Sequence, residues 1–253
     1  MPEPTGRALV IVPTYNERES IPEVTRRLFE AADGTVDLLV IDDGSPDGTS
    51  DVVRHIASER DGVHLLERSG KQGLGTAYVK GFGWAIERGY WAVVEMDADL
   101  SHDPADVPRL LAALDGADLA IGSRYVPGGG VGNWGRVRRA LSAGGNIYAR
   151  AWLGYQVKDS TSGFRAYRIE GLREQDLSSV RSEGYAFQIE MTRRLNLARR
   201  RIVEVPITFV ERAQGKSKMS RRIVLEALAR VARWGIQDRF GARRQRARKA
   251  DLI

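Results

Sequence analysis

Short apolar runs alternate with longer segments of helical period in the first half of the chain. The apolar runs predict strands at Ala8–Val12, Leu38–Ile41, Val63–Leu66, Trp91–Met96 and Leu119–Ile121. The segments between them predict helices at Ile21–Ala32, Thr49–Ala57, Tyr78–Glu87 and Val107–Leu114. This alternation is typical of an α/β fold with a mostly parallel central sheet flanked by helices. We therefore expect functional residues at the carboxyl ends of the strands.

The pattern becomes less regular after Gly122. The remaining predicted elements are a flexible glycine-rich loop at 127–132, a helix at Arg138–Leu153, a polar turn at Lys158–Gly163, a helix at Phe187–Leu197 and a strand at Ile202–Val205. The last segment, Ser220–Arg239, is amphipathic and leads into a polybasic tail at 243–249. We expect a main α/β domain over residues 1–219 and an amphipathic basic helix with its tail over 220–253.

Charge is distributed unevenly along the chain. Residues 1–120 hold 11 basic and 22 acidic side chains, a net charge of −11. Residues 121–253 hold 28 basic and 11 acidic side chains, a net charge of +17. The overall charge of +6 hides this division, which predicts that the two halves meet different ionic partners.

Bulk composition excludes several classes of protein. Hydrophobic residues make up 42% of the chain, enough to bury a core, so wholesale disorder is excluded. The chain has no cysteine, which excludes disulfides and thiol chemistry and fits a reducing compartment. No apolar stretch approaches the roughly 18 residues of a transmembrane helix, and residues 1–6 lack an apolar signal core. We expect a cytoplasmic protein, either soluble or peripheral on a membrane.

Two carboxylates, Asp97 and Asp99, directly follow the strand Trp91–Met96. At this spacing they can converge on one hard cation such as Mg²⁺, which would take its other ligands from substrate phosphates and water. The alternative is an ordinary acidic loop that caps the helix beginning near Pro104. The strongly apolar strand before the pair favours a metal–diphosphate site.

A second acidic turn, Asp42–Thr49, follows the strand Leu38–Ile41. We expect Asp47 and Thr49 to turn the chain into the next helix, and Asp43 to accept hydrogen bonds from a ribose or a base. The first strand ends in an aromatic residue and a carboxylate within Pro13–Glu17. Together with the carboxylate pair after Trp91–Met96, these make three adjacent strand ends, which suit a nucleotide diphosphate and its metal.

Other candidate motifs are weak. In the glycine-rich run Gly70–Gly75 the lysine precedes the glycines, so it is not a phosphate-binding P-loop, and a third glycine of a dinucleotide fingerprint is missing at Tyr78. The three histidines are scattered, and we expect His102 to face solvent. Arg199–Arg201 are expected to be solvated surface charges.

Nine strings in order resemble family-2 glycosyltransferases, specifically the dolichol-phosphate (polyprenol-phosphate) mannose synthases. They are VPTYNE (Val12–Glu17), IDDGSPDGT (Ile41–Thr49), GLGTAY (Gly73–Tyr78), MDADLSH (Met96–His102), GSRY (Gly122–Tyr125), TSGFRAYR (Thr161–Arg168), GYAFQIEM (Gly184–Met191), and VPITFVER with GKSKM (Val205–Met219). Together they span about residues 8–220, and the ordered set is highly specific although each string alone is weak.

The resemblance implies a glycosyltransferase A-type fold that uses GDP-mannose with Mg²⁺ or Mn²⁺. It places the metal and diphosphate on Asp97 and Asp99, with Ala98 between them at the nucleotide sugar. The nucleoside would be surrounded by Pro13, Tyr15, Glu17, Ile41 and Asp43. Some members carry an amide ligand two residues after the second aspartate. Ser101 stands there in this chain, so a water could replace that ligand.

The resemblance also implies that the acceptor is a polyprenyl monophosphate, bound by Arg124, Arg138 and Ser142. With Asp99 these would be the catalytic residues, although spacing alone does not separate Arg138 from Arg139. Arg212 and Lys218 resemble a mobile clamp over the donor phosphates. A phosphate has a second pKa of about 6, so no general base is required, and direct displacement would invert the anomeric centre. Positioning and charge neutralisation would then supply most of the rate.

Three alternative activities and two roles for the C-terminal segment remain at this point. A related synthase could use UDP-glucose; a nucleotidyltransferase would need a glycine-rich phosphate loop that is missing. A nucleic-acid binder is disfavoured because the basic residues accompany an acidic metal motif. Ser220–Arg239, with Trp234, Ile236 and Phe240 and the tail, could rest on an anionic membrane or a membrane-embedded partner. Alternatively, it is a core-packing helix followed by a soluble tail.

Overall fold

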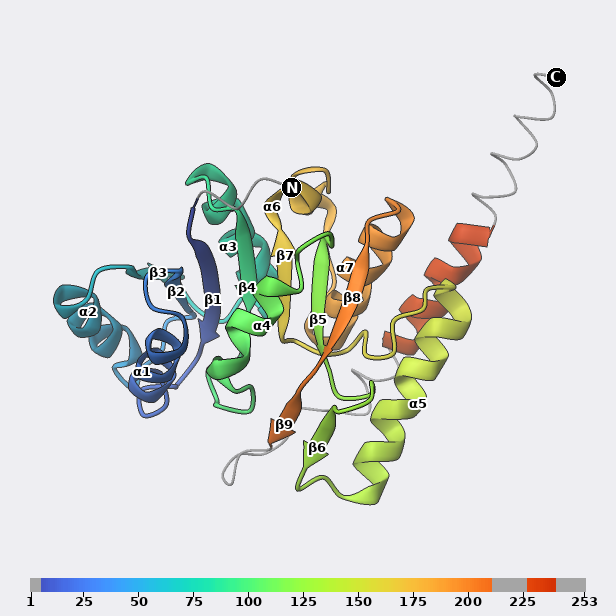
Figure 1. The fold of residues 1–253 in the computed structure, drawn as a ribbon, viewed down its shortest axis with the longest axis horizontal. Helices are drawn as coiled ribbons and strands as arrows, with labels where there is room; N and C mark the ends of the chain where they lie inside the picture. The colour runs from blue at the N-terminus through green and yellow to red at the C-terminus, as the bar shows by residue number, and fades with distance from the viewer. Residues whose placement is uncertain (1–5, 211–226, 240–253) are drawn as a thin grey trace.

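A seven-stranded mixed sheet forms the centre of the computed structural model, which describes residues 6–210 and 227–239 (Figure 1). Its strands are β1 (Ala8–Thr14), β2 (Val36–Asp42), β3 (Val63–Glu67), β4 (Ala92–Glu95), β5 (Leu119–Ser123), β7 (Arg165–Arg168) and β8 (Ile202–Pro206). They lie in the order β3-β2-β1-β4-β7-β5-β8, and β7 alone among them is antiparallel to its neighbours. The predicted α/β class with a mostly parallel sheet is confirmed.

Helices cover both faces of this sheet. They are α1 (Ile21–Ala32), α2 (Thr49–Glu59), α3 (Leu74–Glu87), α4 (Val107–Ala112), α5 (Arg136–Leu153), α6 (Ile169–Arg173), α7 (Gly184–Leu197) and residues 227–239, with short 3-10 turns at Pro104–Asp106 and Leu177–Ser179. Successive residues of a strand point to opposite faces, so Val10 joins the cluster under α1 and α4, while Ile11 joins the cluster under α3 and α7. Because both of its faces are buried, the central strand β1 is a continuous apolar run from Ala8 to Pro13.

Three strands were not expected from the pattern. They are β7, whose sequence is RAYR, β6 (Gly130–Gly132) and β9 (Thr208–Val210). β9 pairs in parallel with β6. The predicted flexible loop at 127–132 is therefore wrong for its last three residues. Its glycines allow a close approach of backbones, because a Cβ on Gly129 would lie 2.4 Å from the carbonyl oxygen of Ser123.

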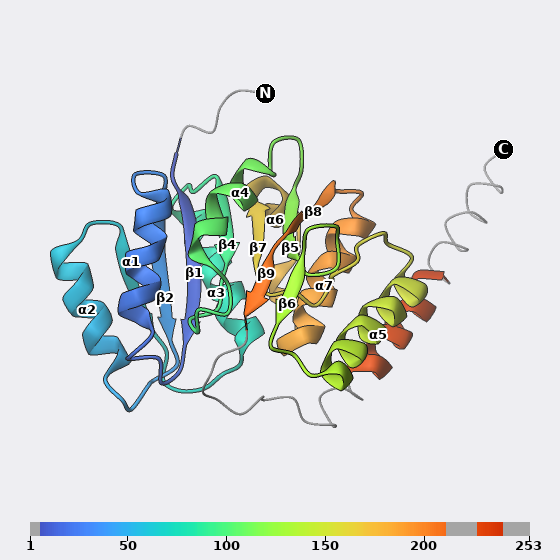
Figure 2. The same ribbon diagram turned by 60° about the horizontal axis from the view of Figure 1, so that its bottom comes forward.

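Residues 227–239 form a helix that lies beside α5 (Figure 2). Val231 is buried in the core, and the hydroxyl of Tyr148 on α5 donates to the carbonyl oxygen of Leu228 at 3.2 Å. This packing corresponds to the second role expected for the segment, although Ile236 remains exposed. The domain boundary at 219/220 and the basic tail lie outside the described residues. Within the described ranges, none of the helices combines the length and the hydropathy needed to cross a bilayer.

The sheet brings several loops to one edge. The strands β1, β2, β4 and β5 all run in the same direction, so the segments after their carboxyl ends share that edge. Because β7 runs the opposite way, the turn before it, Lys158–Gly163, lies at the same edge. This topology assembles the candidate site.

Candidate active site

The carboxylate pair Asp97 and Asp99 follows β4 at this edge. The backbone N–H of Ser101 donates to Oδ1 of Asp99 at 3.0 Å, and the hydroxyl of Ser101 donates to the same oxygen. Ser101 is buried, so it holds Asp99 in place. A Cβ built on Gly163 would lie 3.9 Å from both carboxylate oxygens of Asp97, so the turn before β7 passes close to the pair.

The chemistry around this pair fits a divalent cation. Burial raises the pKa of Glu95 on β4 to about 7, and the negative charge of Asp97 adds to the rise. Burial also raises the pKa of Tyr78, with Asp97 and Asp99 contributing further. Among the described residues no group of three or more His, Cys, Asp or Glu side chains gathers around a point. A cation such as Mg²⁺ held by Asp97 and Asp99 would complete its oxygen shell with substrate phosphates and water, as is usual for this ion.

His102 is not solvent-facing, and the expectation that it would be was wrong. Its side chain is only 2% exposed and stacks on Phe164, with ring centroids 4.9 Å apart. Nδ1 accepts the backbone N–H of Asp97 at 3.3 Å. Burial lowers the pKa of His102, so the neutral ring fixes the backbone at the start of the carboxylate pair. The loop folds back onto Phe164 and Phe209, and these aromatic neighbours exclude water.

Asp43 lies at the end of β2, where a buried arginine holds it. The guanidinium of Arg68 donates to Oδ1 of Asp43, and also to the carbonyl oxygen of Gly73 at 2.9 Å and to Oγ1 of Thr76 at 2.8 Å. This links the glycine-rich run to the acidic turn. Above it, Nζ of Lys71 lies 4.3 Å from the ring centroid of Tyr15. An aromatic ring and a fixed carboxylate thus share one corner of the site.

The other predicted nucleoside residues surround this corner. The backbone N–H of Glu17 donates to Oγ1 of Thr49 at 3.0 Å, and the backbone N–H of Thr49 donates to Asp47 at 3.0 Å. The expected role of Asp47 and Thr49 in turning the chain into α2 is confirmed. Pro13 is half-buried, whereas the side chain of Ile41 is fully buried beneath the edge.

The side chain of Ala98 is also buried, in the core under α4. Ligand contacts by Ala98 and by the nucleoside residues stay predictions.

Two arginines lie across the edge from the carboxylates. Arg124 follows β5, and Arg138 is in the first turn of α5. Both contact the ring of Trp134, at 5.3 Å for Arg124 and 4.4 Å for Arg138, measured from Cζ to the ring centroid. Ser142 lies one turn further along α5. The structure therefore brings the three predicted acceptor residues together, whereas Arg139 is exposed.

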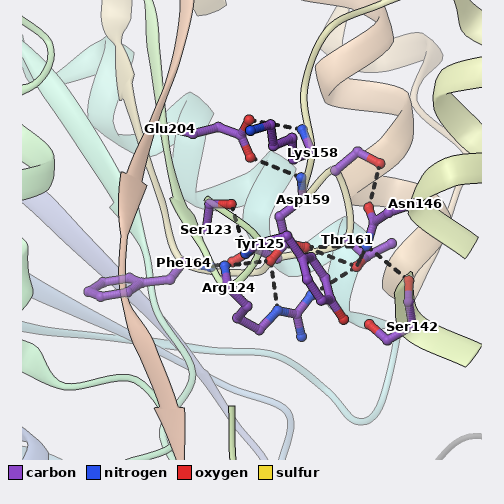
Figure 3. A network of polar contacts seen from close by, with 12 residues as sticks. Ser123, Arg124, Tyr125, Ser142, Asn146, Lys158, Asp159, Thr161, Phe164 and Glu204 are labelled. Atoms are coloured by element: carbon purple, nitrogen blue, oxygen red, sulfur yellow. Dashed lines mark hydrogen bonds and ion pairs between the residues drawn. The ribbon is translucent and has the colours of Figure 1, made fainter. Parts of the chain in front are cut away.

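The guanidinium of Arg124 is fixed by Asp159 from the polar turn Lys158–Gly163 (Figure 3). Nε donates to Oδ2 of Asp159 at 2.7 Å, and Nη2 donates to Oδ1 at 2.6 Å. Burial disfavours the charge on Arg124, but the hydrogen bonds and charge of Asp159 outweigh this and keep its pKa above the usual value. Burial likewise opposes ionisation of Asp159, and Arg124 nevertheless lowers its pKa.

Sequence reasoning missed Arg68, Trp134, Asn146 and Asp159. The available signal was the polar turn Lys158–Gly163, which overlaps the start of TSGFRAYR: had β7 been assigned as an antiparallel strand, this turn would have been placed at the site. The predicted clamp residues Arg212 and Lys218 lie outside the described residues. Of the run Arg199–Arg201, expected to be surface charges, Arg200 makes ion pairs with Asp118 and Glu174.

Comparison with known proteins gives consistent matches. The family model described as glycosyl transferase family 2 matches residues 9–175. The undecaprenyl-phosphate mannosyltransferase of Micrococcus luteus is 52% identical over 95% of this chain and 98% of its own length. The polyprenol monophosphomannose synthase of Mycolicibacterium smegmatis is 53% identical over 94% of this chain and 90% of its own.

A solved structure with the same architecture is glucosyl-3-phosphoglycerate synthase from Mycobacterium tuberculosis. It is 26% identical to this chain, with a TM-score of 0.64, covering 90% of this chain and 80% of that one. That protein was solved with Mn²⁺, UDP-glucose and phosphoglyceric acid. The similarity shows that the sheet and its flanking helices form a glycosyltransferase A-type fold, as the sequence predicted.

Proposed function

The chain belongs to glycosyl transferase family 2, and from this we infer its reaction: transfer of mannose from GDP-mannose to a polyprenyl monophosphate. It is a polyprenyl-phosphate mannosyltransferase. The observation that carries the proposal is the meeting, at one edge of the sheet, of a carboxylate pair suited to a metal–diphosphate with arginines suited to a second phosphate. The two halves of the chain, with net charges of −11 and +17, supply these two sides.

The reaction is a direct displacement at the anomeric carbon of mannose. An oxygen of the lipid phosphate attacks this carbon, the bond to the GDP oxygen breaks, and GDP leaves with the bonding electrons. The α-linked donor thus gives a β-linked lipid phosphate. An acceptor phosphate is largely ionised at pH 7, so the protein does not need a general base.

Catalysis then depends on holding two anions in line. Arg124, Arg138 and Ser142 bind and orient the acceptor phosphate. Asp97 and Asp99 would hold Mg²⁺ or Mn²⁺, which supplies neutralisation of the donor diphosphate when bound. Tyr15 and Asp43 bind the nucleoside, and Arg68 keeps the carboxylate of Asp43 fixed.

One assay tests the reaction and the donor together. Purified protein is offered radiolabelled GDP-mannose or UDP-glucose with a polyprenyl phosphate and Mg²⁺, and the lipid is then extracted. Label should enter the organic phase from GDP-mannose. Label from UDP-glucose alone would overturn the donor assignment, and no label from either donor would overturn the enzymatic proposal.

The acceptor lipid requires the site to meet a membrane, and α5 offers the contact surface. Val137 and Leu141 lie one turn apart on α5 and are 74% and 59% exposed. Val137 directly precedes Arg138 and Leu141 directly precedes Ser142, and the exposed Arg136 and Arg139 add positive charge. We therefore propose that α5 rests on the cytoplasmic face of an anionic membrane, with the helix 227–239 beside it.

Replacing Val137 and Leu141 together by Asp should weaken binding to anionic vesicles at least about tenfold, because the variant loses two apolar contacts and adds two repelled charges. Flotation of the protein with such vesicles measures the change. Leu197→Asp, at the exposed carboxyl end of α7, is the matched control and should float as the unaltered protein does. Equal loss in both variants would exclude α5 as the contact surface.

The basic tail is tested separately. Truncation after Gly241 should reduce flotation if the tail contributes to anchoring. Unchanged binding would exclude the tail as an anchor while leaving the α5 result to stand.

A further inference from the structure

Within the described residues, the hydrogen bonds of the Arg124 guanidinium lie along one side, at Nε and Nη2. Its Nε donates to Asp159, and its Nη2 donates to both Asp159 and Thr161, the latter at 2.9 Å. These bonds use the single proton on Nε and both protons on Nη2. Among residues 6–210 and 227–239 no acceptor pairs with the two N–H groups of Nη1.

We propose that Asp159 is a positioning residue for the transfer reaction: it aims the Nη1 side of Arg124 at the acceptor phosphate. The inference rests on the proposed transfer to a lipid monophosphate. The backbone N–H of Arg124 also donates to Oδ2 of Asp159 at 2.9 Å, so the carboxylate fixes both the main chain and the side chain. An arginine held in this way offers a directed pair of donors to one phosphate.

The charges of Arg124 and Asp159 indicate that Asp159 orients Arg124 and does not strengthen its attraction for the acceptor phosphate. The side chains of Arg124 and Asp159 are 6% and 0% exposed, so the pair is neutral and almost completely buried. Asp159 therefore cancels the positive charge by which Arg124 would attract a lipid phosphate. The carboxylate of Asp159 weakens the attraction between Arg124 and an anion. We therefore assign it the role of holding the N–H groups of Arg124 in place.

The same turn also sets the position of α5. Nδ2 of Asn146, on α5, donates to Oγ1 of Thr161 at 3.1 Å and to the carbonyl oxygen of Ser142 at 3.1 Å. Oδ1 of Asn146 accepts from the hydroxyl of Ser160 at 3.0 Å. The same turn, Lys158–Gly163, therefore contacts both Arg124 and the helix α5, which carries the other acceptor residues.

Glu204 fixes this turn from the opposite side. The carboxylate of Glu204, on β8, accepts the backbone N–H of Lys158 at 2.8 Å and that of Asp159 at 2.9 Å. Figure 3 shows the turn between Glu204 and Asn146. Glu204 thus connects the backbone of Asp159 to strand β8, while the side chain of Asp159 holds Arg124.

Steady-state kinetics of Asp159→Asn separate positioning from simple charge. The substitution removes one negative charge, which raises the net charge at the site by one unit. If charge alone mattered, the acceptor KM would fall and kcat would be unchanged. Because we propose positioning, we expect kcat to fall about 10- to 100-fold, with no fall in the acceptor KM and an unchanged GDP-mannose KM. Asp159→Glu, which keeps the carboxylate, should recover part of the loss.

The matched control is Asp238→Asn. Asp238 accepts from Nε of Arg193 at 2.8 Å and also from Nη2, so it forms the same two-bond pair away from the acceptor residues. Its loss should leave both KM values and kcat unchanged. An Asp159→Asn enzyme with unchanged or raised kcat would overturn the proposal, as would equal changes in the donor and acceptor KM.

A milder variant decides the matter if Asp159→Asn does not fold, as judged by loss of GDP binding. Thr161→Val removes one acceptor of Nη2 and keeps the buried ion pair. We expect kcat divided by the acceptor KM to fall about three- to tenfold, with GDP affinity unchanged. No change in that ratio would overturn the proposal. An unaltered protein that transfers no sugar from any donor would instead overturn the proposed function.

Discussion

Replacement of Asp99 by Asn should lower kcat for mannose transfer by about 10²- to 10³-fold. Asn has the same size and still accepts the hydrogen bonds that Ser101 donates to Asp99, so the loop should keep its shape. What the variant loses is one of the two negative charges proposed to hold the cation. Initial rates of label transfer into the organic phase, measured over a range of Mg²⁺ and Mn²⁺ concentrations, check the prediction.

The same substitution four residues along the loop is the control. Asp103 is exposed, and its carboxylate accepts the backbone N–H of Ala105 at 3.0 Å as a helix cap. Asn caps helices as well as Asp does, so Asp103→Asn should keep both stability and activity. Full activity of Asp99→Asn at ordinary metal concentrations would remove Asp99 from the metal site.

The sheet could be predicted because its strands are buried on both faces. Neighbouring residues such as Val10 and Ile11 enter different cores, which makes a central strand such as β1 a continuous apolar run. The strand β7 could not be predicted in this way. It begins with Arg165, whose buried guanidinium donates to the carbonyl oxygens of Ser160, Ser162 and Gln188. A buried guanidinium whose N–H groups find carbonyl acceptors in the folded chain leaves no apolar signal in the sequence.

In the candidate site, too, some residues could be predicted from the sequence and others could not. Asp97 could be placed because it follows an apolar strand and topology brings such strand ends together, whereas the role of Arg124 was implied by the resemblance of GSRY to the family. Asp159 lies 35 residues from Arg124, and its role depends on the direction of β7. The position of His102 was wrongly expected for a similar reason, because an acidic neighbourhood in sequence does not reveal that Phe164 and Phe209 cover the ring.

Replacement of Arg138 by Ala should lower kcat divided by the KM for polyprenyl phosphate about 10- to 100-fold, the loss expected for one hydrogen bond to a charged group. The KM for GDP-mannose should not change, because Arg138 lies with Arg124 around Trp134, across the site from the carboxylates. Assays at varied acceptor and fixed, saturating donor concentrations measure this difference.

Arg139→Ala is the informative comparison, because it removes the same charge from the next residue of the same helix. Arg139 is exposed, whereas Arg138 is half-buried and contacts Trp134 at 4.4 Å. General attraction of α5 to an anionic membrane would make the two variants equally defective, and added salt would weaken both effects. A direct contact with the acceptor phosphate requires a large loss for Arg138 and almost none for Arg139. The ratio between these two variants therefore separates the catalytic use of the C-terminal positive charge from its use at the membrane.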